Sequence, residues 1–190
     1  MEITLFGHPV LRMKGQPVSL PDPKLPALIE DMLKTMASAH GVGLAAQQVG
    51  LALQLAVVDV RPSKEPSELW LEGKLQALPT FMPLILINPH VEPVGFDKSM
   101  ASEGCLSFPE IHGDVRRPAR VKVSTQTLTG EPFQFEATGL LARAIQHEVD
   151  HLNGILFVDR MNAASRSLLG GRLRRLKKEG EFQAKTLARR

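Results

Sequence analysis

The segment from 138 to 154 constrains the fold most strongly, because it combines the pattern of a core-facing helix with two histidines. Its apolar residues lead directly into the sequence HEVDH. A helix with one apolar face buries that face, so His147 and His151 enter the interior with it, where polar side chains need partners. We therefore predict a buried helix that Thr138 caps and Gly154 ends.

The rest of the chain predicts an α+β fold. Apolar residues at three- and four-residue steps predict a helix over 23–40. Short apolar runs at 53–60 and 83–89 predict buried strands, and alternation over 121–127 and 132–137 predicts a β-hairpin. Strands and helices do not alternate as they do around a parallel sheet. We therefore expect small mixed or antiparallel sheets packed around a central metal-binding helix, with a further helix at the C-terminus.

Two stretches fall outside this pattern. Residues 61–82 form a long, proline-containing segment, which we expect to leave the sheet while its apolar side chains stay against the body. Residues 166–190 predict a basic C-terminal tail with a weakly amphipathic helix. A chain of 190 residues with 43% hydrophobic and 23% charged residues has the composition of one globular domain, which we place at 1–165.

The net charge of the chain is unevenly distributed. The total of +3 divides into −5 over residues 1–159 and +8 over residues 160–190. A mildly acidic body argues against a protein that binds nucleic acid over its whole surface, whereas the tail can contact RNA or simply be solvated.

The N-terminus and the cysteine content predict a cytoplasmic protein. The first residues contain no long apolar run and no basic region of a signal peptide, so we expect neither a secretory signal nor a membrane-spanning helix. Cys105 is the single cysteine, which excludes an internal disulfide and fits a reducing compartment.

The histidine pair has the spacing of a metal site. Residues four apart share one helical face, so His147 and His151 can bind one divalent ion, and Glu148 can reach a water on it. Zinc proteases with this motif usually take a third ligand downstream, but the extended motif fails here because its last position is Phe157. Asp159 lies beyond the end of the helix, which weakens the protease interpretation. Two solvated histidines without a metal are the alternative.

Cys105 is the other candidate ligand. A lone cysteine is commonly an inert apolar residue, and it can also be a nucleophile paired with a histidine. Because a catalytic metal site uses three protein ligands, a metal-binding thiolate is the most economical hypothesis for this residue.

Three sequence motifs occur together in order: GVGLAAQQ at 41–48, EGCLS at 103–107 and QHEVDH at 146–151. With GHPVLR near the N-terminus and Arg117, they cover about residues 4–160, and the sequence resembles the peptide deformylase family. The resemblance implies hydrolysis of the N-formyl group from nascent peptides that begin with formylmethionine, with release of formate. GVGLAA also fits a dinucleotide-binding fingerprint, but it follows a predicted helix and not a strand, so no dinucleotide is expected.

The resemblance also implies roles for individual residues. Cys105, His147 and His151 would bind one divalent ion per chain, with Fe²⁺ as the native ion and Zn²⁺ or Ni²⁺ also accommodated. Glu148 would act as general base and then as general acid. The oxyanion would be stabilised by the side-chain amide of Gln48 and the backbone N–H of Leu106.

Further residues are implied in substrate contact or in support of the metal ligands. An extended peptide would lie between the segments around Val42 and Gly104, and Arg117 and Asp150 would orient the histidines. Histidines 8, 40, 90 and 112 fall outside the motifs and are interpreted as structural or surface residues. The expected substrate-binding residues are Gly41, Val42, Gly43, Glu103, Gly104, Leu140, Arg143 and Ala144.

Two other functions are compatible with parts of the sequence. One is a zinc metallopeptidase that cleaves ordinary peptide bonds. The other is a non-catalytic module that binds RNA or the ribosome through the tail. For a deformylase, the expected partners are formylmethionine peptides and, through the basic tail, the ribosome of bacterial or organellar translation, with no membrane partner.

Overall fold

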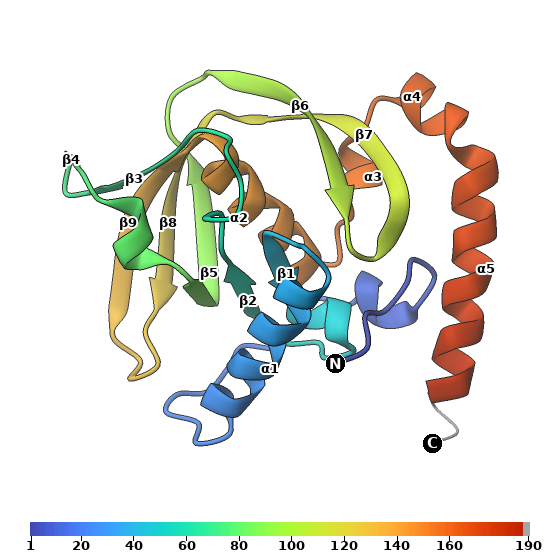
Figure 1. The fold of residues 1–190 in the computed structure, drawn as a ribbon, viewed down its shortest axis with the longest axis horizontal. Coiled ribbons are helices and arrows are strands. Elements are labelled where there is room, and N and C mark those ends of the chain that lie inside the picture. The colour runs from blue at the N-terminus through green and yellow to red at the C-terminus, as the bar shows by residue number, and fades with distance from the viewer. Residues whose placement is uncertain (188–190) are drawn as a thin grey trace.

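The structure is a computed structural model that describes residues 1–187. Figure 1 shows one large sheet, a separate pair of strands and the helices around them. The strands are β1 (Gly43–Ala45), β2 (Leu55–Val58), β3 (Ser67–Leu71), β4 (Lys74–Leu75), β5 (Leu84–Pro93), β6 (Lys98–Cys105), β7 (Phe108–Pro118), β8 (Arg120–Gln126) and β9 (Pro132–Thr138). The α-helices are α1 (Leu25–Ser38), α2 (Gly139–Leu152), α3 (Phe157–Arg160), α4 (Ala163–Leu168) and α5 (Gly170–Leu187), and the 3₁₀ helices are η1 (Pro9–Arg12), η2 (Ala46–Val49) and η3 (Leu78–Phe81).

The large sheet carries α2 on one face. Its strand order is β1-β2-β5-β8-β9-β3-β4, and every pairing is antiparallel. The buried residues Leu141, Ile145 and Leu152 of α2 pack with sheet residues such as Leu86 and Val123. Burying each such side chain stabilises the fold by about 1.5–3 kcal/mol, and this packing holds α2 in a defined position beside β1.

Strands β6 and β7 form a second, two-stranded sheet that arches toward α3 and α5 (Figure 1). Phe108 on β7 belongs to a buried cluster with Phe157 of α3 and with Leu173 and Leu176 of α5. Cys105, the last residue of β6, is partly buried against the same cluster. The hairpin therefore holds the cysteine at the end of β6, against this buried cluster.

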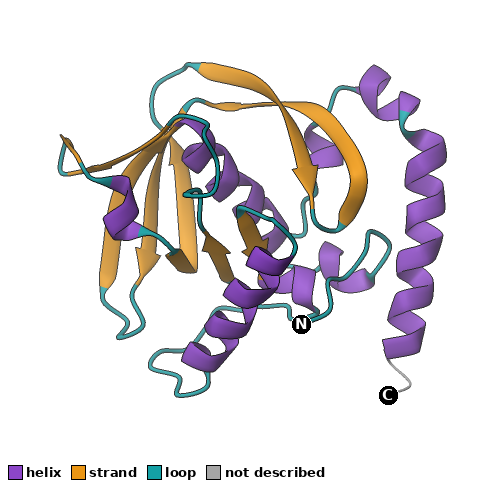
Figure 2. Cartoon of the chain, in the orientation of Figure 1, coloured by secondary structure: helices purple, strands orange, loops and turns teal. Residues whose placement is uncertain are grey.

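The predicted α+β class is confirmed, and Figure 2 shows helices and antiparallel strands side by side. The predicted helix over 23–40 is α1, and the runs 53–60 and 83–89 contain β2 and the start of β5. The predicted hairpin is β8 paired with β9. These segments were predictable because a buried face imposes its own period on the sequence.

The prediction that residues 61–82 leave the sheet is wrong. This segment contains β3 and β4, which extend the large sheet beyond β9. Leu69 and Met82 are buried in the main core, so the prediction that apolar side chains of this segment stay against the body is confirmed. Its prolines, Pro62, Pro66 and Pro79, lie outside β3 and β4, so they mark the loops around these two strands and not the strands themselves.

The N-terminus of α2 is capped differently from the prediction. Thr138 occupies the N-cap position but its side chain makes no capping hydrogen bond. Instead, the backbone N–H of Leu140 donates to the Pro66 carbonyl at 2.9 Å, and that of Leu141 donates to the Ser67 hydroxyl at 3.1 Å. The segment before β3 thus satisfies helix donors that would otherwise lack partners.

The basic tail forms α5, as expected, and lies beyond β7 at the side of the molecule (Figure 1). Gly180 packs directly against the backbone carbonyl of Phe6, and the side chain of Gln183 accepts from the Leu5 N–H at 2.8 Å. Residues 188–190 of the predicted tail lie outside the described residues. Within the described part of the chain, no helix has the length and apolar character needed to cross a membrane.

Candidate active site

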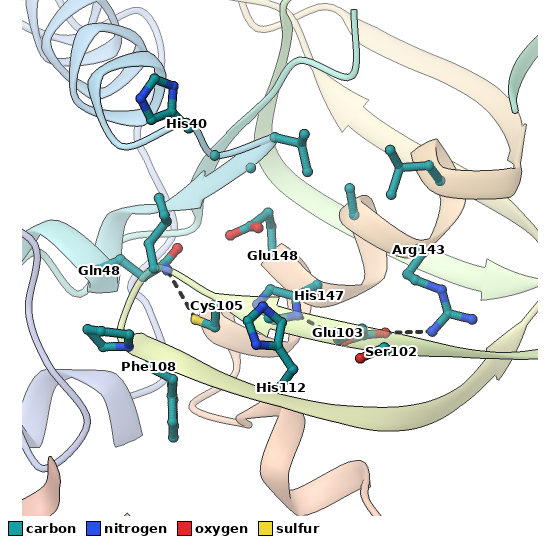
Figure 3. Close-up of a pocket in the computed structure, with 18 of the residues that line it drawn as sticks. His40, Gln48, Ser102, Glu103, Cys105, Phe108, His112, Arg143, His147 and Glu148 are labelled. Atoms are coloured by element: carbon teal, nitrogen blue, oxygen red, sulfur yellow. Dashed lines mark hydrogen bonds and ion pairs between the residues drawn. The ribbon is translucent and has the colours of Figure 1, made fainter. Parts of the chain in front are cut away.

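A cavity of about 480 Å³ lies between α2, β1 and the β6–β7 hairpin. Figure 3 shows side chains of α2 and of the hairpin around it, together with His40 and Gln48 from the segments before and after β1. The residues that the sequence analysis assigned to catalysis or to substrate contact all line this cavity: Gly41, Val42, Gly43, Gln48, Glu103, Gly104, Leu106, Leu140, Arg143, Ala144 and Glu148.

Cys105, His147 and His151 form a compact group of metal-binding side chains. Their ligand atoms all lie within 4.8 Å of one another, and Cys105 Sγ is 3.2 Å from His151 Nε2. Helix α2 supplies the two imidazoles from one face, and the end of β6 supplies the sulfur. A sulfur and two imidazole nitrogens are a ligand set for Zn²⁺, Fe²⁺ or Ni²⁺, and three protein ligands is the number that catalytic sites use.

His147 is oriented on two sides. Its Nδ1 lies 3.0 Å from Glu103 Oε2, which leaves Nε2 for a metal ion. The ring of Phe157 stacks on it with centroids 6.2 Å apart and an interplanar angle of 25°. The position that the extended protease motif reserves for a third histidine therefore holds an aromatic ring that packs against a ligand. His151 Nδ1 is buried without a hydrogen-bond partner in residues 1–187.

The pKa values in the site follow from burial and from the contact between His147 and Glu103. Burial lowers the pKa of His151 well below its usual value, which favours the neutral ring that binds metals. Burial also acts to lower the pKa of His147, but hydrogen bonds to Cys105 and Glu103 raise it well above its usual value. Burial acts to raise the pKa of Glu103, yet Arg117 and His147 hold it far below its ordinary range. Glu103 thus stays an acceptor for the His147 ring.

Glu148 lies beside the metal-binding group with a free oxygen. Its side chain is buried, and within the described chain Oε2 has no hydrogen-bond partner. Burial raises the pKa of Glu148 to about 7. A carboxyl group with a pKa near neutrality can both accept and release a proton at physiological pH.

The amide of Gln48 has a defined orientation. Its Oε1 accepts from the backbone N–H of Ala45 at 2.8 Å, so its Nε2 points toward Cys105 Sγ at 3.4 Å (Figure 3). Leu106 follows Cys105 in the turn between β6 and β7 and lies on the cavity wall. The amide donor of Gln48 therefore faces the space next to the metal-binding group.

A buried network of charges supports this arrangement. Arg117 donates to Glu103 Oε1 and Oε2 at 2.6 and 2.9 Å and to Asp150 Oδ2 at 2.8 Å. Arg143 donates to Glu103 Oε1 at 2.7 Å and to Ser99 and Val115 on the β6–β7 hairpin. The sequence analysis expected Arg117 and Asp150 to orient the histidines, but the residue in contact with the His147 ring is Glu103.

The structure adds residues that the sequence analysis did not assign to the site. His40 and His112 line the cavity (Figure 3), so their interpretation as residues outside the site is incomplete. Arg160 extends the charge network, since its Nη2 lies 2.6 Å from Asp150 Oδ1. These residues lie outside the sequence motifs, and no periodic pattern distinguishes them from surface residues.

A buried carboxyl group beside three side chains that can hold a metal ion is the arrangement of a metal-dependent hydrolase, and the fold and site define this class. The sequence matches the polypeptide deformylase family over residues 1–167. The chain belongs to the peptide deformylase family, the metal-dependent enzymes that remove the N-formyl group from nascent peptides.

Individual relatives agree with this membership. The chain is 48% identical over 178 residues to the peptide deformylase of Methylacidiphilum infernorum, covering 94% of this chain and 93% of the relative. It is 44% identical over 186 residues to that of Opitutus terrae, covering 97% of each. The crystal structure of a Synechococcus elongatus peptide deformylase in complex with actinonin matches with a TM-score of 0.76 and 42% identity over 90% of this chain and 87% of that one. Arabidopsis thaliana peptide deformylase 1B matches with a TM-score of 0.82 and 36% identity over 96% and 93%.

Proposed function

We propose that this chain removes the formyl group from the N-terminal formylmethionine of nascent polypeptides and releases formate. The observation that carries the proposal is the cavity, which joins the metal-binding group and Glu148 to a wall formed by Val42, Leu140 and Ala144. A formyl group at the metal end places the first side chain against these apolar residues. Family membership supports the same reaction.

Each step uses a residue of this chain. Cys105, His147 and His151 would hold the divalent ion, which would supply a water of lowered pKa and polarisation of a carbonyl oxygen. Glu148 accepts the proton of the attacking water and donates it to the departing amine. The Gln48 amide and the backbone N–H of Leu106 stabilise the negative charge that develops on the formyl oxygen, where each such donor lowers the barrier by about 3 kcal/mol.

The substrate-binding residues divide into two groups. Val42, Leu140 and Ala144 contact the methionine side chain, together with the alkyl part of Arg143, whose guanidinium is held by Glu103. Gly41 and Gly104 line the cavity and are not buried, so that an extended peptide adds as a strand between their segments, whereas Gly43 is buried against Glu148. This mode of binding recognises the peptide backbone and gives little selectivity beyond the first side chain.

Gly43 is a strict requirement of this geometry. A Cβ atom built on Gly43 lies 2.3 Å from Glu148 Oε1. Gly43→Ala should displace the carboxylate and lower kcat by about 10²-fold, the cost of misplacing a reacting group by about 1 Å. Steady-state formate release measures this effect. Gly171→Ala is the matched control, because a Cβ there meets no atom within 4 Å; equal activity of both variants would contradict the proposed contact.

Formate release from a formyl-Met-Ala peptide, with and without a chelator, tests the proposed reaction. Chelator-sensitive release of formate is expected, with no cleavage of unformylated Met-Ala. Peptide-bond cleavage without formate would instead support the metallopeptidase.

We propose Fe²⁺ as the native ion, with Zn²⁺ or Ni²⁺ as ions that the same ligands accept. Metal analysis of protein purified without oxygen should find iron, and zinc or nickel in its place would contradict this choice.

We also propose that residues 1–165 form the catalytic domain of a cytoplasmic protein and that the basic segment 166–190 contacts the ribosome of bacterial or organellar translation. The exposed cations of α5 support this partner. Because Leu173 and Leu176 are buried in the body, charge reversal tests the contact more cleanly than deletion. Arg175→Glu combined with Lys178→Glu should abolish salt-sensitive sedimentation with ribosomes and leave deformylation of short peptides unchanged. Unaltered sedimentation would exclude the contact.

A further inference from the structure

Arg160 lies at the solvent end of a continuous chain of charged side chains that ends at a metal-binding histidine. Arg160 contacts Asp150 through Nη2 at 2.6 Å and through Nε at 3.2 Å. Asp150 accepts from Arg117 at 2.8 Å, and Arg117 holds both oxygens of Glu103. Glu103 Oε2 lies 3.0 Å from Nδ1 of His147. No break occurs between the surface and the imidazole.

Burial changes sharply along this chain. The side chain of Arg160 is 46% exposed, whereas those of Asp150, Arg117 and Glu103 are 9%, 5% and 4% exposed. In such an interior each charged group takes the position that its partners allow, because an unpaired buried charge is costly. A substitution of the surface residue Arg160 therefore affects the buried side chains of Asp150, Arg117 and Glu103.

Helix α3 carries a second contact to the same histidine. Phe157, three residues before Arg160, is buried and stacks on the ring of His147. One short helix thus contacts the face of the ring directly and its Nδ1 through the charged chain. Both contacts orient the ring and neither uses the nitrogen left for a metal.

We propose that Arg160 is a positioning residue that fixes the orientation of His147 through Asp150, Arg117 and Glu103. Without Arg160, Asp150 retains only Arg117, which shifts toward it and weakens its two hydrogen bonds to Glu103. Glu103 then holds the imidazole less firmly, and the metal is bound less tightly. This inference rests on the proposed role of His147 as a metal ligand.

The electrostatic effect of Arg160 has the opposite sign. Its positive charge repels a bound dication, so removing the charge alone strengthens metal binding. Loss of orientation weakens metal binding, since partners that orient a ligating histidine contribute about 10- to 100-fold to metal affinity. The direction of change in metal release therefore distinguishes a positioning role from a mere nearby charge.

The experiment measures metal release from zinc-loaded protein into an excess of a coloured chelator. Arg160→Gln should release zinc about tenfold faster than the wild type, at the low end of the range for such partners. Arg160→Lys, which keeps a donor within reach of Asp150, should recover part of the loss. In cobalt-loaded protein, the visible absorption bands should shift in Arg160→Gln, which reports altered ligand geometry independently of activity.

Arg12→Gln is the matched control. Arg12 is 44% exposed and pairs with Asp159, the neighbour of Arg160, but it does not belong to the charged chain. Arg12→Gln should release zinc no faster than the wild type and leave the cobalt spectrum unchanged. Release from Arg160→Gln at or below the wild-type rate would overturn the positioning role. A wild type that retains no metal would overturn the ligand assignment, and the inference with it.

Discussion

Replacing Glu148 with glutamine should lower kcat for a formylmethionine peptide by about 10³-fold, the middle of the range for general acid–base catalysis. Glutamine has nearly the same shape but cannot accept the proton of water. The Glu148 side chain lies against Gly43, and glutamine, with the same number of heavy atoms, should occupy the same position. Because Glu148 is not among the three metal-binding side chains, the metal content should stay at the wild-type level. Formate release and atomic absorption measure the two quantities on the same preparation.

Glu92→Gln is the matched control for this substitution. Glu92 is exposed on β5, and its ion pair in residues 1–187 is with His90, so removing its charge should leave kcat within about twofold of the wild type. Near-normal formate release by Glu148→Gln would remove Glu148 from the proton transfer. Loss of both metal and activity would assign it to metal retention instead.

The second large effect is on stability, at the buried network around Arg117. Arg117→Met should lower the free energy of unfolding by about 3 kcal/mol, because breaking a buried ion pair leaves a charge without its partner. Arg117 contacts two buried carboxylates, those of Glu103 and Asp150. Each of these keeps one other arginine, Arg143 or Arg160, so the expected loss is at the lower end of the measured range. The melting temperature should fall by about 6–12 °C.

Urea unfolding of the metal-free protein measures this loss without a contribution from metal binding. Arg175→Met provides the control, since Arg175 is 86% exposed and pairs with Glu179 along the same helix. Its loss should change the free energy of unfolding by about 0.5 kcal/mol or less. A similar effect of the two substitutions would show that burial of the Arg117 network contributes little to stability.

Much of the site was predictable because its signals are local. Two histidines four residues apart share one face of any helix, and the apolar residues before them show that this face is buried. The three motifs identified the family, and with it the candidate roles of Gln48, Cys105 and Glu148. The prolines of 61–82 misled the prediction, because strand pairing at a sheet edge depends on β9, a partner more than fifty residues away.

The sequence by itself determined the helices over 23–40 and 139–152, the central strands and the hairpin over 121–137, the α+β class, the histidine pair and the family. Only the tertiary structure decided which groups surround the histidines. Cys105 reaches His151 because the β6–β7 hairpin folds over α2, and Glu103 takes the place next to His147 that was expected for Asp150 or Arg117. Arg160 joins the network from a short helix outside the motifs. Periodicity reports the local backbone and its buried face, whereas ion pairs form between residues that meet only when distant segments pack together.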